Sequence, residues 1–322
     1  MSEMTVADIE ATAALSLDLL RCPVTRAPLD WQGDALVAQS GHGALRYRID
    51  SSGIPLFAEQ FCSPEAREQQ AHYDRIAALY ATSLSYPHTQ EYNAYLDDAL
   101  LDVIDDAVLG TVAEICCGRG EAFQLLGGRI KRGVGVDISP AMLRAAQAEN
   151  AGLPFVFIQG DATTLPLADA AFDSVFMLGG IHHVGNRAGL FAEIARILKP
   201  GGLFYFREPV SDFALWRWLR AIIYRVSPTL DHENERPLRY VETVPPLQDA
   251  GLVCKYWRTH GFLGFCVFMN SDVLVFNRLF RFVPGIRTLT RLWTKIDEWT
   301  VQLPGLRRAG LQVVGVAERI RD

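Results

Sequence analysis

From about residue 111 onward, short apolar runs alternate with segments of helical periodicity, and this alternation constrains the fold more than any other feature of the chain. The runs are TVAEIC, GVGVDI, PFVFIQ, FDSVFML and GGLFYFRE, and the segments between them include GEAFQLLGG, SPAMLRAAQAEN and NRAGLFAEIARIL. Apolar strands that alternate with amphipathic helices are typical of an α/β fold with a doubly wound parallel sheet. Ligands bind such sheets beyond the carboxyl ends of the strands, so we expect functional residues there.

Acidic residues and glycines stand at the ends of three successive strands of this pattern. The first strand leads into EICCGRGEA, which contains Glu114, Gly118 and Gly120, the second ends at Asp137, and the third is followed by Asp161. Glycines let the backbone approach a ligand closely, and the start of the following helix attracts negative charge. One acid alone is more often a cap or turn residue. Three acids at three neighbouring strand ends favour a ligand site.

The positions of these acids indicate a nucleoside rather than a dinucleotide. Asp137 can accept hydrogen bonds from two ribose hydroxyls. Asp161 can accept from an adenine amino group while the Ala162 backbone N–H donates to the ring. Phe123 occupies the place of the third glycine of a dinucleotide fingerprint, which counts against NAD.

The motif series EICCGRG, GVDIS, GDATTLPLADAAFDSVFM, HHV and ILKPGGLFYF resembles that of the class I S-adenosylmethionine (SAM) methyltransferases. The resemblance spans about residues 70–210, and the closest branch is the ubiquinone- and menaquinone-biosynthesis and small-molecule group. It implies a Rossmann-like seven-stranded sheet whose last strand, at 310–318, is antiparallel. It also implies SAM as cofactor. The cofactor-binding residues expected on this basis are Glu114, Cys116, Gly118, Gly120, Asp137, Ile138, Asp161, Ala162 and Leu178, and Tyr73 is added for its aromatic ring.

Two cysteines distinguish this motif. Cys116 stands where the family usually has its first glycine, which narrows the expected pocket for the methionine end of the cofactor. Cys117 matches a position where the family often has cysteine, and we expect it to be a packed thiol. Adjacent residues of a strand point to opposite faces, so a shared metal or redox role is the weaker interpretation.

The expected reaction is methyl transfer to a small, hydrophobic acceptor, such as a natural product or a lipid-like precursor. His183, His182 and Glu208 lie after the fourth and fifth strands and are the candidates for a general base or for orienting the acceptor. We favour His183 over His182, because one histidine of the pair is expected to be structural. The aromatic face of Tyr73 would suit a sulfonium. Two alternatives stay open: a cyclase or lyase that consumes SAM without methyl transfer, and a non-catalytic SAM-binding scaffold that activates a partner.

The N-terminal part predicts two further units, at residues 1–62 and 63–110, before the SAM-binding domain at 111–322. The motifs LLRCP, ALRYRID and SGIPLF resemble the zinc-ribbon family that includes the small activator subunit of tRNA methyltransferases. Tetrahedral zinc needs about four nitrogen or sulfur ligands, which Cys22 and His42 cannot supply. We therefore expect a metal-free, degenerate ribbon that serves packing or dimerisation, followed by a helical cap.

The segment between the sixth strand, LVCKYW, and the last strand is far longer than a hairpin loop. We expect a helical insertion at about 259–309 that acts as a lid over the acceptor, with peripheral membrane contact as a further role. One of its stripes consists of Leu289, Leu292, Trp293, Ile296 and Trp299. The alternative is that these helices pack on the sheet edge or on a second copy in a homodimer.

Charge and cysteine usage limit the partners and the compartment. The net charge is −6, yet residues 207–322 carry 17 Lys and Arg against 12 Asp and Glu, a local excess of +5. With a pI near 5.7 and no concentrated basic tract, nucleic acid is not expected as a partner. Six scattered cysteines, no basic N-terminal signal and no long apolar span favour the cytoplasm.

Overall fold

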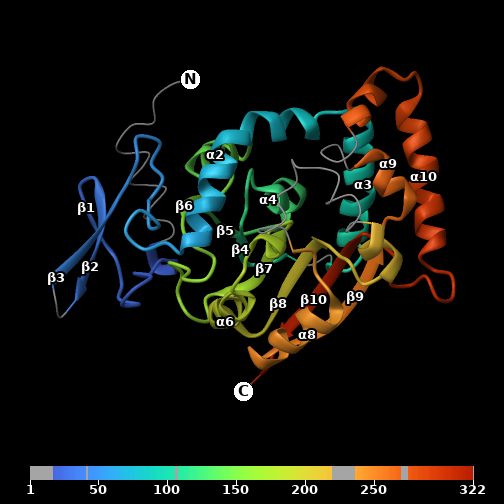
Figure 1. Ribbon diagram of the computed structural model, residues 1–322. Helices are drawn as coiled ribbons and strands as arrows, with labels where there is room; N and C mark the ends of the chain where they lie inside the picture. The colour runs from blue at the N-terminus through green and yellow to red at the C-terminus, as the bar shows by residue number, and fades with distance from the viewer. Residues whose placement is uncertain (1–16, 41–42, 106–107, 220–235, 270–274, 322) are drawn as a thin grey trace.

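The computed structural model describes residues 17–40, 43–105, 108–219, 236–269 and 275–321. Its centre is a seven-stranded sheet with the order β6-β5-β4-β7-β8-β10-β9 (Figure 1). The five strands from β6 to β8 are parallel to their neighbours, and β10 is antiparallel to both β8 and β9. This arrangement confirms the predicted doubly wound sheet and its antiparallel last strand. The strands are β4 (Thr111–Ile115), β5 (Arg132–Asp137), β6 (Phe155–Gln159), β7 (Phe172–Leu178), β8 (Leu198–Pro209), β9 (Leu252–His260) and β10 (Gln312–Arg319).

Helices cover both faces of this sheet. One face packs against α3 (Pro87–Leu101), α4 (Glu121–Leu126) and α5 (Pro140–Glu149) through a cluster that includes Leu100, Phe123 and Leu143. The other face packs against α6 (Arg187–Ile197) and α8 (Tyr240–Asp249), with Phe191 and Leu247 in its cluster. Side chains of successive strand residues alternate between the two clusters, as the pleat requires. Buried apolar strands between two helical layers give the expected α/β/α architecture.

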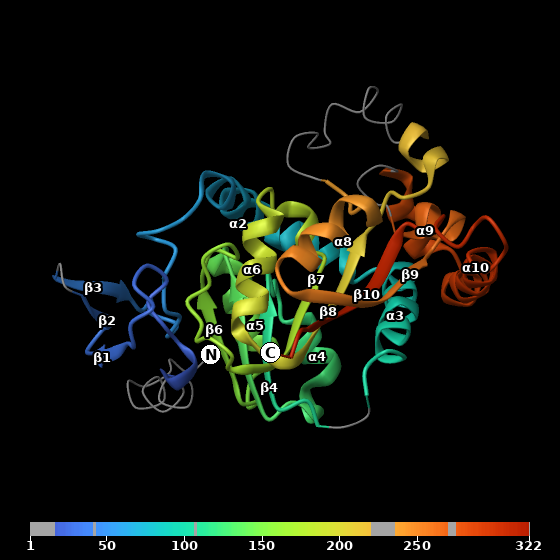
Figure 2. The same cartoon turned by 90° about the horizontal axis from the view of Figure 1, so that it is seen from below.

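The N-terminal unit forms a small antiparallel sheet, β1-β2-β3, that lies beside the β6 edge (Figures 1 and 2). Its strands are β1 (Asp30–Gln32), β2 (Ala35–Ser40) and β3 (Gly43–Arg48). The chain after β3 pairs with β6: Gln159 N donates to Pro55 O at 2.9 Å, and Phe57 N donates to Gln159 O at 3.1 Å. This pairing covers an edge strand that would otherwise be open to other chains.

Cys22 is buried inside this unit. Its Sγ lies 3.0 Å from the Tyr47 hydroxyl and accepts a hydrogen bond from Thr25 N at 3.3 Å. His42 lies outside the described residues, and among those described no three His, Cys, Asp or Glu side chains gather as a metal site would require. The ribbon-like origin and the metal-free state of this unit remain predictions.

Helix α2 (Pro64–Leu84) crosses above the carboxyl ends of the parallel strands and leads into α3 (Figure 1). Ser63 begins it, and the Ser63 hydroxyl accepts from Ala66 N at 3.2 Å. Ser63 therefore caps the helix, and Pro64 occupies the first helical position, where a missing N–H costs nothing. Because α2 lies across the strand ends, it can close a site from above.

The predicted insertion contains α9 (Leu263–Phe268), the 3₁₀ segment η4 (Val275–Phe282) and α10 (Ile286–Thr300), which pack on α3. The buried Asp297 of α10 holds it in place, accepting from Phe262 N, Gly264 N and Phe265 N at 2.9–3.0 Å and from the Tyr92 hydroxyl at 2.5 Å. The described residues of this segment do not line the cavity at the carboxyl ends of the strands, and the lid remains a prediction. Residues 214–219, after β8, are helical.

Candidate functional site

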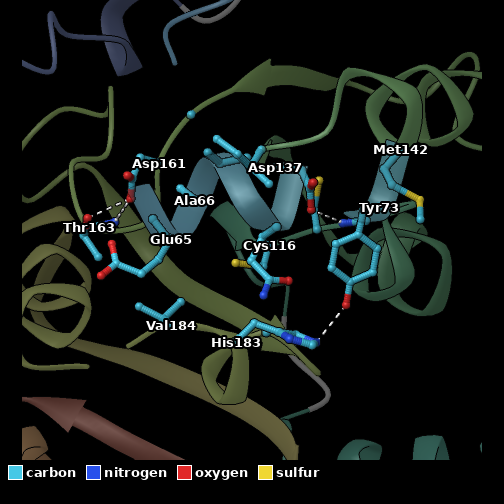
Figure 3. A pocket seen from close by; sticks show the side chains of 18 of the residues that line it. Glu65, Ala66, Tyr73, Cys116, Asp137, Met142, Asp161, Thr163, His183 and Val184 are labelled. Carbon is cyan, nitrogen blue, oxygen red and sulfur yellow. Dashed lines mark hydrogen bonds between the residues drawn. The ribbon is translucent and has the colours of Figure 1, made fainter. Parts of the chain in front are cut away.

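A cavity of about 310 Å³ lies between α2 and the carboxyl ends of β4, β5, β6 and β7 (Figure 3). Nine of the residues predicted from the sequence line it: Tyr73, Cys116, Gly118, Asp137, Ile138, Asp161, Ala162, Leu178 and His183. Glu114, Gly120, His182 and Glu208 are not among the lining residues. The strand ends converge here because the strands are parallel neighbours in one sheet.

The loop after β4 turns sharply under the cavity. Cys116, Gly118 and Gly120 all have left-handed backbone conformations, with φ of 51°, 50° and 78°. Such a φ costs little for glycine but about 1–2 kcal/mol for another residue, which gives a physical reason for the glycine that the resemblance leads us to expect at the Cys116 position. A Cβ at Gly118 would meet no protein atom within 4 Å, so the bare backbone faces the cavity. This is the cradle that a ligand can approach closely.

Asp137 ends β5 and is held by the backbone around it. Its Oδ2 accepts from Gly118 N at 2.8 Å and its Oδ1 from Ser139 N at 2.9 Å. Burial raises the pKa of Asp137, although these backbone donors oppose the rise. Each carboxylate oxygen keeps a further lone pair, so the two oxygens can accept from neighbouring hydroxyls of a ligand in the cavity.

Asp161 is fixed by two segments of the chain that are far apart in sequence. Its Oδ2 accepts from Ser63 N at 2.9 Å, and its Oδ1 accepts from Thr163 N at 2.8 Å and Thr163 Oγ1 at 2.7 Å. Burial favours protonation, but these donors outweigh it and lower the pKa of Asp161. The contact with Ser63 ties the start of α2 to the site, and sequence reasoning did not identify it.

Glu114 points away from the cavity toward the start of α4. Its oxygens accept from Ala122 N at 2.8 Å and Phe123 N at 3.3 Å, and the side chain is buried. Burial raises the pKa of Glu114 to about 8. The carboxylate pairs two donors that a helix start leaves unpaired, and it thereby positions the glycine loop relative to β4.

Tyr73 and His183 meet across the cavity (Figure 3). The Tyr73 hydroxyl lies 2.7 Å from His183 Nε2, and the two rings pack edge to face with centroids 5.6 Å apart. Burial, together with His182 and His72, holds the pKa of His183 well below its ordinary value. The imidazole is therefore neutral near pH 7, the state in which it can take a proton.

His182 and Glu208 form a second pair behind this wall. Glu208 is fully buried, and its carboxylate accepts from Gly180 N at 2.7 Å, Ile181 N at 2.8 Å and His182 Nδ1 at 2.8 Å. These bonds hold the short turn Ile181–His183, which carries His183 into the cavity. The geometry separates the two histidines: His183 faces the cavity and His182 faces Glu208.

Apart from Tyr73, sequence reasoning missed the residues with which the helices and the segment after β7 line the cavity. Glu65, Ala66 and Gln69 come from α2, Met142 from α5, and Val184 from the segment after β7. The sequence predicted a helical segment here, but the path of α2 across the strand ends depends on long-range contacts such as that of Ser63 with Asp161. No local signal in the sequence carries that path.

The comparisons with known proteins agree with this geometry. Residues 113–206 match the protein family described as methyltransferase domain. The 2-phytyl-1,4-naphtoquinone methyltransferase of Synechocystis sp. is 36% identical over 121 residues, which cover 34% of this chain and 50% of the relative. The demethylmenaquinone methyltransferase of Renibacterium salmoninarum is 30% identical over 144 residues, which cover 44% of this chain and 58% of the relative. The chain thus spans about half the length of these two relatives.

Among solved structures, the cyclase SpnF aligns with 81% of this chain and 98% of its own, at a TM-score of 0.56 and 18% identity. A likeness at this identity shows the fold alone. It agrees with the observed seven-stranded sheet and leaves the reaction to the chemistry of the site.

Proposed function

We propose that the chain is a SAM-dependent methyltransferase that acts on a small, hydrophobic acceptor. The observation that carries this proposal is the convergence of Gly118, Asp137 and Asp161, from three neighbouring strand ends, on one cavity that Tyr73 and His183 close. The matched methyltransferase domain, residues 113–206, contains all three strand ends. The names of the two quinone methyltransferases support a quinone-type acceptor as the first class to test.

The residues of the cavity fit SAM in charge and shape. Asp137 would hold the ribose hydroxyls, Asp161 and the Ala162 N–H would hold the adenine, and Ile138, Met142 and Leu178 would flank the base with apolar surface. Gly118 leaves room for the amino-acid end beside the loop. Bound SAM supplies an activated methyl group on a positively charged sulfur.

The chain's own contribution is alignment and proton removal. Tyr73 lies over the cavity from α2, where its ring can face a sulfonium and its hydroxyl can hold His183. His183 is neutral and its Nε2 is paired with the Tyr73 hydroxyl at the cavity, so we assign the pair the removal of the proton from an acceptor hydroxyl or acidic C–H: the Tyr73 oxygen takes that proton as the hydroxyl passes its own to Nε2. Glu208 and His182 act as positioning residues, because they hold the turn that presents His183.

The test is to incubate the full chain with SAM and a panel of reduced quinones, catechols and amines, and to follow products by mass spectrometry. S-adenosylhomocysteine that forms only with an acceptor, together with a methylated acceptor, is the expected result. Methylthioadenosine formed without an acceptor would point instead to a cyclase or lyase. SAM binding without turnover on any acceptor, with a co-purifying protein, would point to a scaffold.

A further inference from the structure

Helix α10 turns its apolar stripe outward. Leu289, Leu292, Ile296 and Trp299 are 42%, 55%, 40% and 64% exposed. The buried face of the same helix is largely polar, with Thr290, Thr294 and Asp297 beside Ile286. These four side chains therefore do not bury themselves against the sheet or α3. Four large apolar side chains exposed along one helix face indicate a contact with another molecule.

The segment before α10 extends this surface. Leu279, Phe282 and Val283 are 59%, 69% and 41% exposed, and they precede the turn at Gly285 that leads into the helix. Together with the α10 stripe they form what we call the outer apolar surface. It lies at the end of the molecule opposite to the β1-β2-β3 sheet (Figure 1).

The outer apolar surface lies within a strongly basic segment. Residues 275–309 contain seven Lys and Arg against two Asp and Glu. Both acids are engaged inward: Asp297 caps α9, and Glu298 accepts from the Tyr95 hydroxyl at 2.6 Å and from His260. Lys295 is exposed and borders, with Thr288 and Leu292, a shallow hollow along the helix. Arg287 and Arg291 pair with Glu91 of α3, which reduces the local excess of positive charge beside the apolar side chains but does not cancel it.

This combination selects one kind of occupant. An amphipathic helix with Leu and Trp on one face and Lys and Arg beside it is typical of helices that lie in the interface of an anionic bilayer. A second copy of the chain is disfavoured, because two such faces would bring their excess positive charges together. No helix in the described part of the chain is both long and apolar enough to cross a bilayer, so the contact would be peripheral.

We propose that α10 and the preceding η4 segment dock this protein on the surface of a membrane that contains anionic lipids. Docking by this surface does not require the proposed methyl transfer. If both hold, the acceptor class is a lipid-borne molecule that reaches the site from the membrane phase.

The test is co-sedimentation of the full chain with vesicles of phosphatidylcholine, with and without about 30 mol % phosphatidylglycerol. The expected result is binding to the anionic vesicles that weakens steeply with added salt. Leu292→Asp and Lys295→Glu should each lower the partition coefficient about tenfold or more. Both side chains are exposed, so their replacement should leave folding intact, which circular dichroism can verify.

Matched controls carry the same chemical changes elsewhere. Val241→Asp replaces an exposed apolar residue of α8, and Lys131→Glu reverses an exposed charge before β5. Both should bind vesicles as the unmodified chain does. Equal losses in the controls, or no vesicle binding at all, would overturn the proposal. A dimer that light scattering detects and Leu292→Asp dissociates, or capture of a protein partner in place of vesicles, would also overturn it. Calorimetry with SAM separates these outcomes from a failure of the proposed function.

Discussion

Replacing Asp137 by Asn tests whether the carboxylate at the end of β5 holds a ligand. The substitution preserves the size of the side chain but turns one acceptor oxygen into a donor NH₂ group. Both oxygens of Asp137 accept backbone N–H groups, from Gly118 and Ser139. One of these donors must lose its partner, so the glycine loop and the ligand site are perturbed together.

The size of the effect follows from these contacts. Leaving one buried donor unpaired should lower the free energy of unfolding by about 1–3 kcal/mol. In the complex, a hydrogen bond from a ribose hydroxyl to a charged acceptor would be lost, which is worth about 1.5–3 kcal/mol. The dissociation constant for SAM should therefore rise roughly 10-fold to 150-fold.

A matched control separates ligand binding from loss of stability. Asp173 also accepts a backbone N–H, from Thr111 at 2.8 Å, but it stands at the start of β7, away from the cavity. Asp173 also pairs with Lys199 at 2.7 Å and is partly exposed, so Asp173→Asn should lower stability through the weakened ion pair and leave SAM affinity unchanged. Calorimetric titration with SAM, beside urea unfolding, measures both quantities. If Asp137→Asn binds SAM within about threefold of the unmodified chain, the assignment of Asp137 is wrong.

Three further predictions concern other parts of the structure. His183→Ala should lower kcat about 100-fold or more while SAM affinity stays nearly constant. Because the pKa of His183 is lowered, the unmodified enzyme should lose activity only well below about pH 6.5. A change in KM with kcat unchanged would contradict the role of His183 in proton removal. Cys116 has a left-handed backbone with φ of 51°, which glycine tolerates and a β-branched residue does not. Cys116→Gly should therefore raise the free energy of unfolding, measured in urea, by up to about 1 kcal/mol, and Cys116→Val should lower it. If the valine variant were the more stable of the two, backbone strain at this position would be refuted. The hydrogen bond from His260 lowers the pKa of Glu298 to about 2, below its ordinary 4.5, so ionised Glu298 stabilises the fold above about pH 4.5 and this contribution is lost as the pH falls toward 2. Glu298→Gln should lower the free energy of unfolding by about 2–3 kcal/mol at pH 7 and make stability less dependent on pH between 4.5 and 2. An unchanged pH dependence of unfolding in that range would count against the His260–Glu298 pair.

Two parts of the site illustrate what local pattern can and cannot supply. Asp137 and Asp161 were predictable because the place of a residue at or after the end of its own strand is a local property, and parallel neighbours bring those ends together. The sequence supported only a preference for His183 over His182 as the histidine that enters the site. Adjacent residues of one turn point in different directions, and the sequence does not say which direction faces the cavity. The buried Glu208 carboxylate holds His182, and His183 then faces Tyr73.

The sequence by itself determined the alternation of strands and helices and the acids at the strand ends, because each depends on periodicity or on neighbours along the chain, while the antiparallel last strand was implied by the resemblance to the methyltransferases. Tertiary structure alone decided which way α10 faces. Its apolar stripe was visible as a pattern, but the sequence left open whether the stripe covers the acceptor, contacts a membrane, or packs on the sheet edge or on a second copy. The helix is instead anchored by Asp297, which accepts four hydrogen bonds from α3 and from the start of α9. A carboxylate with that many partners is stabilised inside the protein, and the apolar residues on the other side of the helix are therefore turned outward.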